Sequence, residues 1–301
     1  MKTAARFTLI FLLLMVAACV PFAQKTELVA TSTATLETVE PAAPTVDAGL
    51  TEQLLRNMEY LAPELGVSVK LVDGIFKGAS QSVTMLAQFA LGDLNGDQVN
   101  DAAILLAENG GGTGEFVSLV VIASQGGEFK QVGSVLIDDR PIIQSLEINE
   151  GTIILDATIH GLNDAMVSPT VKVHKTYRLL ENNLTLMSQS STLEGGSERS
   201  IVIEAPLNGS EVSGSVQLKG SMPIAPFENN LRFRIVDMAG SELLTQGFMV
   251  QSADVGGPSV FDNEVTLPVT PIGTWVRLEL AELSMADGSV VTLNSVLVKI
   301  K

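Results

Sequence analysis

The stretch Val171-Lys172-Val173-His174-Lys175-Thr176-Tyr177-Arg178-Leu179 alternates along its whole length. Its odd-numbered positions, Lys175 among them, fall on one face of an extended strand, and its even-numbered positions are polar and fall on the other. A period of two residues is typical of a strand with one buried and one hydrated face. The stretch therefore predicts an antiparallel sheet that covers a core.

Outward from this strand, the same pattern fills residues 51–192. Turn residues separate the runs, as where Asn149-Glu150-Gly151 divides two apolar segments and predicts a hairpin. A short helix over 51–61, with Thr51 as its N-cap, is expected to come first. Short strands at this spacing favour an antiparallel sandwich or barrel. The strands are predicted at 67–72, 83–91, 101–107, 116–123, 128–137, 142–149, 152–159, 171–180 and 184–189.

A second β region follows the polar, glycine-containing segment 193–200, which we interpret as a linker. Six or seven strands within 201–301 are typical of an immunoglobulin-like sandwich. The Cys…Trp…Cys framework of antibody domains is absent, and Trp275 is expected to fill the core. The sequence thus predicts an all-β protein of two antiparallel β domains. The strands of the second domain are predicted at 201–204, 215–220, 230–237, 242–250, 259–267, 274–281 and 289–300.

The N-terminal segment reads as a targeting signal. Lys2 and Arg6 precede and border the apolar run 7–16, which is too short to span a bilayer because a spanning helix needs roughly 20 residues. Val16-Ala17-Ala18-Cys19 is similar to a bacterial lipoprotein signal. That resemblance implies that residues 1–18 are a signal peptide, cut off before Cys19, and that the Cys19 thiol is lipidated. A plain secretory signal with an unmodified cysteine is the alternative.

Residues 19–50 are rich in Thr, Ala, Pro and Val without apolar periodicity, which predicts a disordered tether.

The charge of the chain limits its partners. The chain has a formal net charge of −16 and no basic cluster, which argues against nucleic acid as a partner. Because anionic headgroups repel an acidic protein, we expect attachment to the membrane through the lipid on Cys19. The predicted location is extracytoplasmic, with the protein lipid-anchored to the cell membrane.

One segment, 93–101, carries a pattern with metal-binding chemistry. Oxygen side chains stand at Asp93, Asn95, Asp97 and Asp101, and the backbone carbonyl of Val99 falls between them. Ca²⁺ prefers about six to eight oxygen ligands arranged around a curled loop. The segment looks like the short Asp-x-Asn-Gly-Asp-Gly-x-x-Asp loops between strands in FG-GAP-type and related extracellular repeats. That resemblance implies that Ca²⁺ is bound as a stabilising ion.

Two residues depart from calcium-loop patterns. Ile104 stands where an EF-hand has its bidentate Glu, and a strand rather than a helix is predicted to follow. Gln98 stands where the short loops usually have a Gly in the left-handed conformation, which costs a non-Gly residue roughly 1 kcal/mol. The alternative is therefore a metal-free hairpin in which the Asp and Asn side chains cap their own backbone.

Catalytic motifs are scarce, and we expect no enzyme. His160 and His174 are the only histidines, which excludes a multi-His zinc site. The glycine-rich segment 110–114 lacks the Gly-Lys-Ser/Thr ending of a phosphate loop, and no Gly-x-Ser-x-Gly elbow occurs. A cleft with His160 in hydrogen-bond reach of Asp156 or Asp164 would favour an enzyme. A closed, polar surface without pockets would favour a binding module.

Both folded regions carry ordered sets of motifs. Those after the linker are Ile201-Val202-Ile203, Pro206-Leu207-Asn208-Gly209, Val212, Gly220, Phe227-Glu228, Leu231 to Asp237, Gly240, Gly247, Phe261 and Val265. They resemble the immunoglobulin-like Gmad domain first noted in bacterial spore germination proteins, which implies an extracytoplasmic binding or architectural role. Those before the linker are Leu71 to Gly74, Gly92 to Asp97 with Asp101 to Ala103, Gly111 to Phe116, and Asp164 to Thr170. They resemble a module of largely bacterial secreted proteins that implies no activity.

Together these features predict a lipid-anchored binding or structural protein of the cell envelope. Its partner is expected to be an envelope protein or a glycan. The alternative is an enzyme or an enzyme inhibitor whose site is built from loops. A two-lobed solute-binding lipoprotein is disfavoured because alternating β-α units are absent from the pattern.

Overall fold

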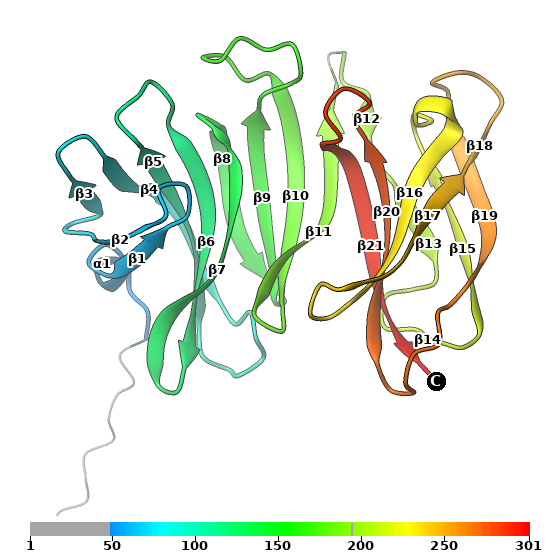
Figure 1. Ribbon diagram of the computed structural model, residues 1–301, viewed down its shortest axis with the longest axis horizontal. Coiled ribbons are helices and arrows are strands. Elements are labelled where there is room, and N and C mark those ends of the chain that lie inside the picture. Colours follow the sequence, from blue (N-terminus) through cyan, green and yellow to red (C-terminus); the bar gives the residue numbers. More distant parts are fainter. Residues whose placement is uncertain (1–48, 194) are drawn as a thin grey trace, which may run out of the picture. The chain divides into compact units, whose positions relative to one another are not determined.

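The computed structural model describes residues 49–193 and 195–301. Regular structure in this part of the chain is nearly all β and forms four sheets of two, five, four and ten strands (Figure 1). The strand pairs are antiparallel, apart from a short parallel pair between β14 (Glu211–Val212) and β21 (Val290–Ile300). No helix among the described residues is long and apolar enough to span a bilayer. The predicted all-β class is confirmed.

The strands lie close to their predicted positions. The elements up to residue 192 are α1 (Glu52–Leu55), β1 (Glu59–Ala62), β2 (Val67–Lys70), β3 (Ile75–Lys77), β4 (Ser82–Gly92), β5 (Asp101–Asn109), β6 (Phe116–Gln125), β7 (Glu128–Asp139), β8 (Ile142–Asn149), β9 (Thr152–Ile159), β10 (Val171–Leu180) and β11 (Asn183–Thr192). The later elements are β12 (Glu198–Arg199), β13 (Val202–Ala205), β14, β15 (Ser215–Met222), the 3-10 turn η1 (Phe227–Asn229), β16 (Asn230–Asp237), β17 (Glu242–Met249), β18 (Gln251–Ser252), β19 (Ser259–Thr266), β20 (Trp275–Leu283) and β21.

The five-stranded sheet β3-β4-β5-β6-β7 is covered on both faces, which explains why its middle strands are almost continuously apolar. Along β5, Ala102, Ile104 and Leu106 pack into one core with residues of α1, β1 and β2. The alternate residues Ala103 and Leu105 pack into a second core with residues of β8, β9 and β10. Since each fully buried aliphatic side chain contributes roughly 1.5–3 kcal/mol, β5 helps to stabilise both cores.

The strand β10 confirms the alternation from which the sheet was predicted. Val173 and Tyr177 are buried in the second core, whereas Lys172 and His174 are exposed. Lys175 follows the same alternation and is buried, although its side chain is charged. The pattern of exposure therefore follows the direction of each side chain rather than its polarity.

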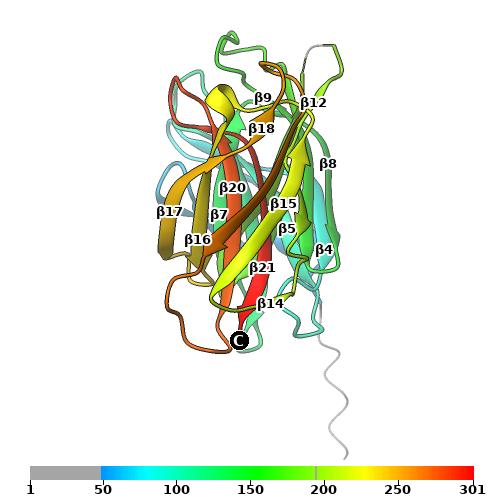
Figure 2. The same ribbon diagram turned by 90° about the vertical axis from the view of Figure 1, so that its right-hand side faces the viewer.

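The residues after 200 form a sandwich of two sheets, β17-β16-β20-β21 and β13-β15-β19-β18 (Figures 1 and 2). Phe233, Phe248 and Phe261 form an aromatic row in its core, with successive ring centroids 6.0 and 5.5 Å apart. The second contact is edge-to-face, and such pairs contribute about 0.5–1.5 kcal/mol beyond the area that they bury. The predicted immunoglobulin-like sandwich is confirmed.

The strands β8 to β11 pack against the five-stranded sheet and form a first sandwich with it. One sheet runs through both sandwiches. β11 pairs with β21 at Ser188↔Asn294 and Gln189↔Leu293, which gives the strand order β17-β16-β20-β21-β11-β10-β9-β8. The buried Thr292 hydroxyl donates to the Gln189 carbonyl at 2.7 Å beside this pairing. This junction, between β11 and β21, joins the two halves of the described chain by backbone hydrogen bonds.

Two predictions about single elements are wrong. The helix expected over 51–61 ends at Leu55, and a strand follows at Glu59–Ala62, because Tyr60 and Ala62 reach the core as alternate residues of an extended chain. Trp275 is 38 % exposed and does not fill the core, because its neighbour Val276 takes the inward position at the start of β20. The predicted signal peptide 1–18, Cys19 and almost the whole predicted tether 19–50 lie outside the described residues.

Gly220 on β15 tests how closely the second sandwich is packed. A Cβ atom at this position would clash with the Val202 carbonyl oxygen on β13 and with the Phe261 ring. The substitution Gly220→Ala is expected to lower the free energy of unfolding by about 1–3 kcal/mol, because the surrounding backbone must shift. Gly112→Ala is the matched control, since a Cβ there meets nothing within 4 Å. Urea unfolding measures both; an unchanged midpoint for Gly220→Ala would contradict this packing.

Candidate functional site

The loop between β4 and β5 is held by its own side chains. Asp93 Oδ1 accepts the backbone N–H groups of Asn95 and Gly96 at 3.2 and 2.6 Å, and Asp93 Oδ2 accepts that of Gln98 at 2.9 Å. These hydrogen bonds, that from Gln98 foremost, hold the pKa of the Asp93 carboxyl below its usual range. Asp93 therefore fixes the path of the loop while it remains ionised.

Asn95 and Asp97 repeat this arrangement further along the loop. Asn95 Oδ1 accepts the Asp97 N–H at 2.9 Å, and Asp97 Oδ1 accepts the Val99 N–H at 2.8 Å. The Asn95 amide also donates to Asp97 Oδ2 at 3.0 Å. These are the backbone caps expected of the metal-free hairpin. Because a carboxylate offers about four lone pairs, these hydrogen bonds leave acceptor capacity on Asp93 and Asp97.

Asp101 differs from the other loop aspartates because it is fully buried at the start of β5. Its Oδ2 accepts the Leu94 N–H at 2.9 Å, and its Oδ1 accepts the Ser124 N–H at 3.4 Å. Burial raises the pKa of Asp101, and the charges of Asp97 and Asp93 raise it further. The Asp93 and Asp97 carboxylates thus lie close enough to act on the charge of Asp101. Within residues 49–193 and 195–301, however, no three His, Cys, Asp or Glu side chains converge as a set of metal ligands.

A hollow of about 670 Å³ opens beside this loop. Its lining includes Asp93 and Asn95, the Glu150-Gly151 turn, Arg178 of β10 and the exposed Trp275. An indole ring offers an apolar face, and carboxylate, amide and guanidinium groups offer hydrogen bonds around it. The arrangement suits a ligand with an apolar face and several hydroxyl groups. The sequence identified the loop but did not identify the tryptophan beside it.

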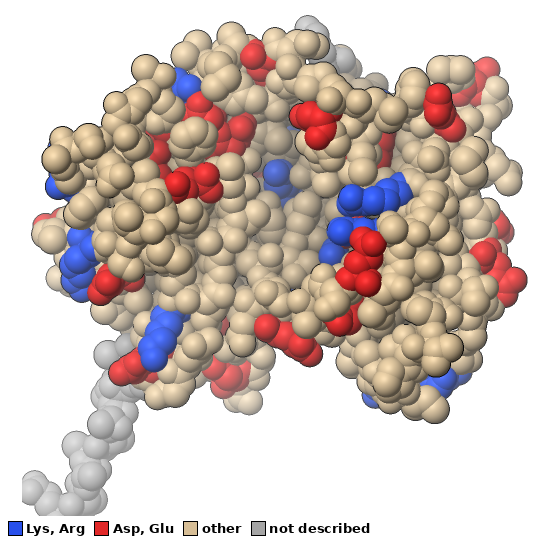
Figure 3. Space-filling view, viewed as in Figure 1, with Lys and Arg blue, Asp and Glu red and all other residues tan. Residues whose placement is uncertain are grey.

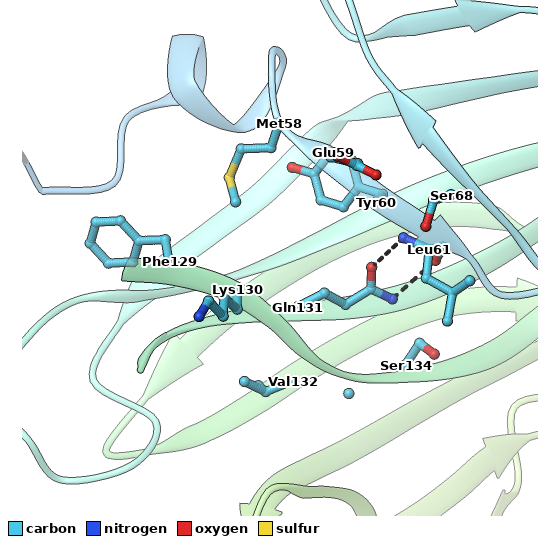
Figure 4. Close-up of a pocket in the computed structure, with 11 residues that line it drawn as sticks. Met58, Glu59, Tyr60, Leu61, Ser68, Phe129, Lys130, Gln131, Val132 and Ser134 are labelled. Atoms are coloured by element: carbon cyan, nitrogen blue, oxygen red, sulfur yellow. Dashed lines mark hydrogen bonds between the residues drawn. The ribbon is translucent and has the colours of Figure 1, made fainter. Parts of the chain in front are cut away.

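A second hollow, of about 550 Å³, lies between β1 and β7 (Figure 4). Gln131 spans it, since its Oε1 accepts the Leu61 N–H at 3.0 Å and its Nε2 donates to the Leu61 carbonyl at 3.1 Å. The side-chain amide thus replaces one backbone pair between two strand edges. It leaves fewer unpaired groups on those edges for another chain to pair with.

A third hollow, which we call the central cavity, has a volume of about 730 Å³ and lies over β10 and β11. β7 borders it on one side, and the turn between β20 and β21 borders it on the other. Figure 3 shows this face of the molecule hollowed in its middle, with a Lys or Arg group in the depth of the hollow. The lining includes His160 and Lys175.

The hydrogen-bond partner of the His160 ring is Asp138, and not Asp156 or Asp164. Its Nδ1 lies 2.9 Å from Asp138 Oδ2, which also accepts the His160 backbone N–H. Burial alone would lower the pKa of His160, but the hydrogen bond to Asp138 and its charge outweigh burial and raise the pKa. Asp164 instead caps Gly161 and Thr170, and Asp156 lies against His174 at 2.8 Å. The cleft is present, and Asp164 lies close enough for its charge to act on His160, but the hydrogen bonds of His160 go to Asp138 rather than to Asp156 or Asp164.

Comparison with known proteins places only the C-terminal region. Residues 200–289 match the Gmad2 family model, described as the immunoglobulin-like domain of bacterial spore germination. The resemblance predicted for this region is therefore confirmed. No curated protein and no solved structure matches the chain. The lipoprotein signal and the resemblance of the first β region stay predictions.

Gln98 carries the backbone strain that the sequence predicted, with a φ of +69°. Gln98→Gly is expected to raise the free energy of unfolding by up to about 1 kcal/mol, because Gly adopts this conformation without Cβ strain. Gln98→Ala is the control, since it removes the side chain beyond Cβ and keeps the Cβ atom. Chemical denaturation in EDTA compares the two variants. A glycine variant no more stable than the alanine variant would contradict the left-handed conformation.

Proposed function

We propose that this chain is a lipid-anchored, extracytoplasmic protein of the cell envelope that binds or structurally supports a partner. The observation that carries the proposal is the immunoglobulin-like sandwich, matched over residues 200–289, since that domain fits a structural or binding role. Val16-Ala17-Ala18-Cys19 supports the lipid anchor. Several acyl chains would hold the protein firmly, because each buried CH₂ group contributes roughly 0.8 kcal/mol.

We propose binding rather than catalysis as the activity. A general base must come within hydrogen-bond reach of the proton that it removes. The Nε2 atom of His160 is buried, and its Nδ1 is engaged with Asp138. His174 is exposed on β10, on the face opposite the buried Val173, and is paired with Asp156. Neither histidine is therefore favourably placed to act on a substrate in a cavity.

The partner that we propose is a glycan or an envelope protein. The hollow beside the Asp93 loop supports a glycan, because Trp275 offers a flat apolar face beside Asn95 and Arg178. The net charge of −16 makes nucleic acid an unfavourable partner.

We also propose that Ca²⁺ stabilises the loop 93–101. The support is the spacing of oxygen groups at Asp93, Asn95, Asp97, Val99 and Asp101, and the repulsion of the Asp101 carboxylate by Asp93 and Asp97, which a cation would relieve. The Asp101 carboxylate faces inward, where it accepts the Leu94 and Ser124 N–H groups. The ion would add structural stability and would take part in no reaction.

The lipid anchor is tested at Cys19. In cells fed labelled palmitate, the wild-type chain is expected to incorporate the label and to lose residues 1–18, whereas Cys19→Ser is expected to do neither, because the acceptor thiol is gone. Val20→Ala is the neighbouring control and should behave as the wild type. Gel migration and label incorporation measure the two steps together. Labelling or normal processing of Cys19→Ser would contradict the proposal.

The calcium proposal is tested by thermal unfolding of the full chain in detergent. Millimolar Ca²⁺ is expected to raise the melting temperature above that in EDTA, because a ligand that binds only the folded state stabilises it. Asp97→Ala should lose this shift. Asp254→Ala, an exposed aspartate of the second sandwich, should keep it. A wild-type melting temperature that does not respond to Ca²⁺ would refute the calcium site.

A further inference from the structure

The central cavity combines an aliphatic lining with a buried charge. Ten of its twenty lining residues are Val, Leu or Ile. Its volume of about 730 Å³ falls within the range of roughly 300–1,000 Å³ that is usual for small-molecule sites. The floor of the cavity includes Val173, Lys175 and Tyr177 of β10 and Gln189 and Ser191 of β11.

Lys175 is the unusual member of this lining. It is 8 % exposed and stands between Val173 and Tyr177 on the inward face of β10. Among the residues that the structure describes, none forms a hydrogen bond or an ion pair with its ammonium group. Lysine is seldom fully buried without a partner, because the low-dielectric interior disfavours an isolated charge. Burial lowers the pKa of Lys175 to about 8, so the ammonium form still predominates at pH 7.

The carboxylates around the cavity are engaged elsewhere. The charge of Asp138 acts on Lys175, but Asp138 Oδ2 already accepts two N–H groups of His160. Asp287 accepts the backbone N–H and the hydroxyl of Ser289.

Arg199 also lines the cavity, and its guanidinium group is paired with Glu282 at 3.0 Å. Lys175 is therefore the cation in this lining that has no described anion bound to it.

We propose that the central cavity binds an amphiphilic monocarboxylate, a small molecule with one carboxylate and an aliphatic body. The carboxylate pairs with the Lys175 ammonium, and the aliphatic lining covers the body. A single negative charge fits better than a phosphate dianion, because one unpaired ammonium would leave the second charge of a dianion buried and uncompensated. This ligand extends the proposed binding role, but it needs neither the lipid anchor nor Ca²⁺, so either proposal can fail without the other.

The proposal is tested by calorimetric titration of octanoate into the full chain in lipid nanodiscs, with empty nanodiscs as the blank. Octanoate is expected to bind at pH 7. Its affinity should fall about tenfold at pH 9, because the protonated fraction of a lysine with a pKa of about 8 falls about tenfold between these values. Octanol has the same body without the charge and is expected to bind more weakly and without dependence on pH.

Matched variants separate the charge from the fold. Lys175→Met keeps the length of the side chain and should lose at least tenfold in octanoate affinity at pH 7, together with the dependence on pH. Lys172→Met changes an exposed lysine of the same strand and should bind as the wild type. If Lys175→Met does not fold, the pH dependence of the wild type decides. The proposal is overturned if wild-type binding is absent at millimolar octanoate, is independent of pH, or is matched by octanol or by Lys175→Met.

Discussion

The arrangement of the described chain depends on the pairing between β11 and β21. Only two residue pairs, Ser188↔Asn294 and Gln189↔Leu293, make this ladder. Buried side chains add to it, since Ser295 donates to the Met187 carbonyl at 2.8 Å and Arg277 donates to the Leu186 carbonyl at 3.0 Å. Each of these groups would be costly to bury without its partner. A short ladder thus becomes a specific junction because buried polar side chains of β20 and β21 need the backbone carbonyls of β11 as partners.

The junction also borders the central cavity. β11 contributes to the floor of the central cavity, and the turn that leads into β21 contributes a wall. Gln189 connects β11 to β21, because its amide donates to the Val290 carbonyl at 2.8 Å while its backbone pairs with Leu293. Arg277 acts from the other side of the junction, where it also binds the buried Glu279 at 2.7 Å. The charged and polar residues here hold strands in place, which leaves Lys175 distinct as a buried cation without such a partner among the described residues.

The sequence predicts most of the strands because a period of two residues is a local signal. The ends of β8, β9, β10 and β16 coincide with their predicted positions. Local signals fail where tertiary packing decides, as at β1, where the core takes Tyr60 and Ala62 from an extended chain. They also do not specify which strand edges meet, so the sequence does not predict the β11–β21 junction. The loop around Asp93 was found from its spacing, whereas Lys175 was visible only as one charge on an inward face.

The most direct test of the account is scanning calorimetry of the full chain. If the junction unites the two sandwiches, unfolding is expected to give one transition whose calorimetric and van't Hoff enthalpies agree. Thr292→Val, which removes the buried hydroxyl donated to Gln189, should move that transition to lower temperature as a whole. Two separate transitions in the wild type, with Thr292→Val affecting only one of them, would contradict the account. The central cavity would then lie between two independently unfolding modules rather than on one continuous sheet.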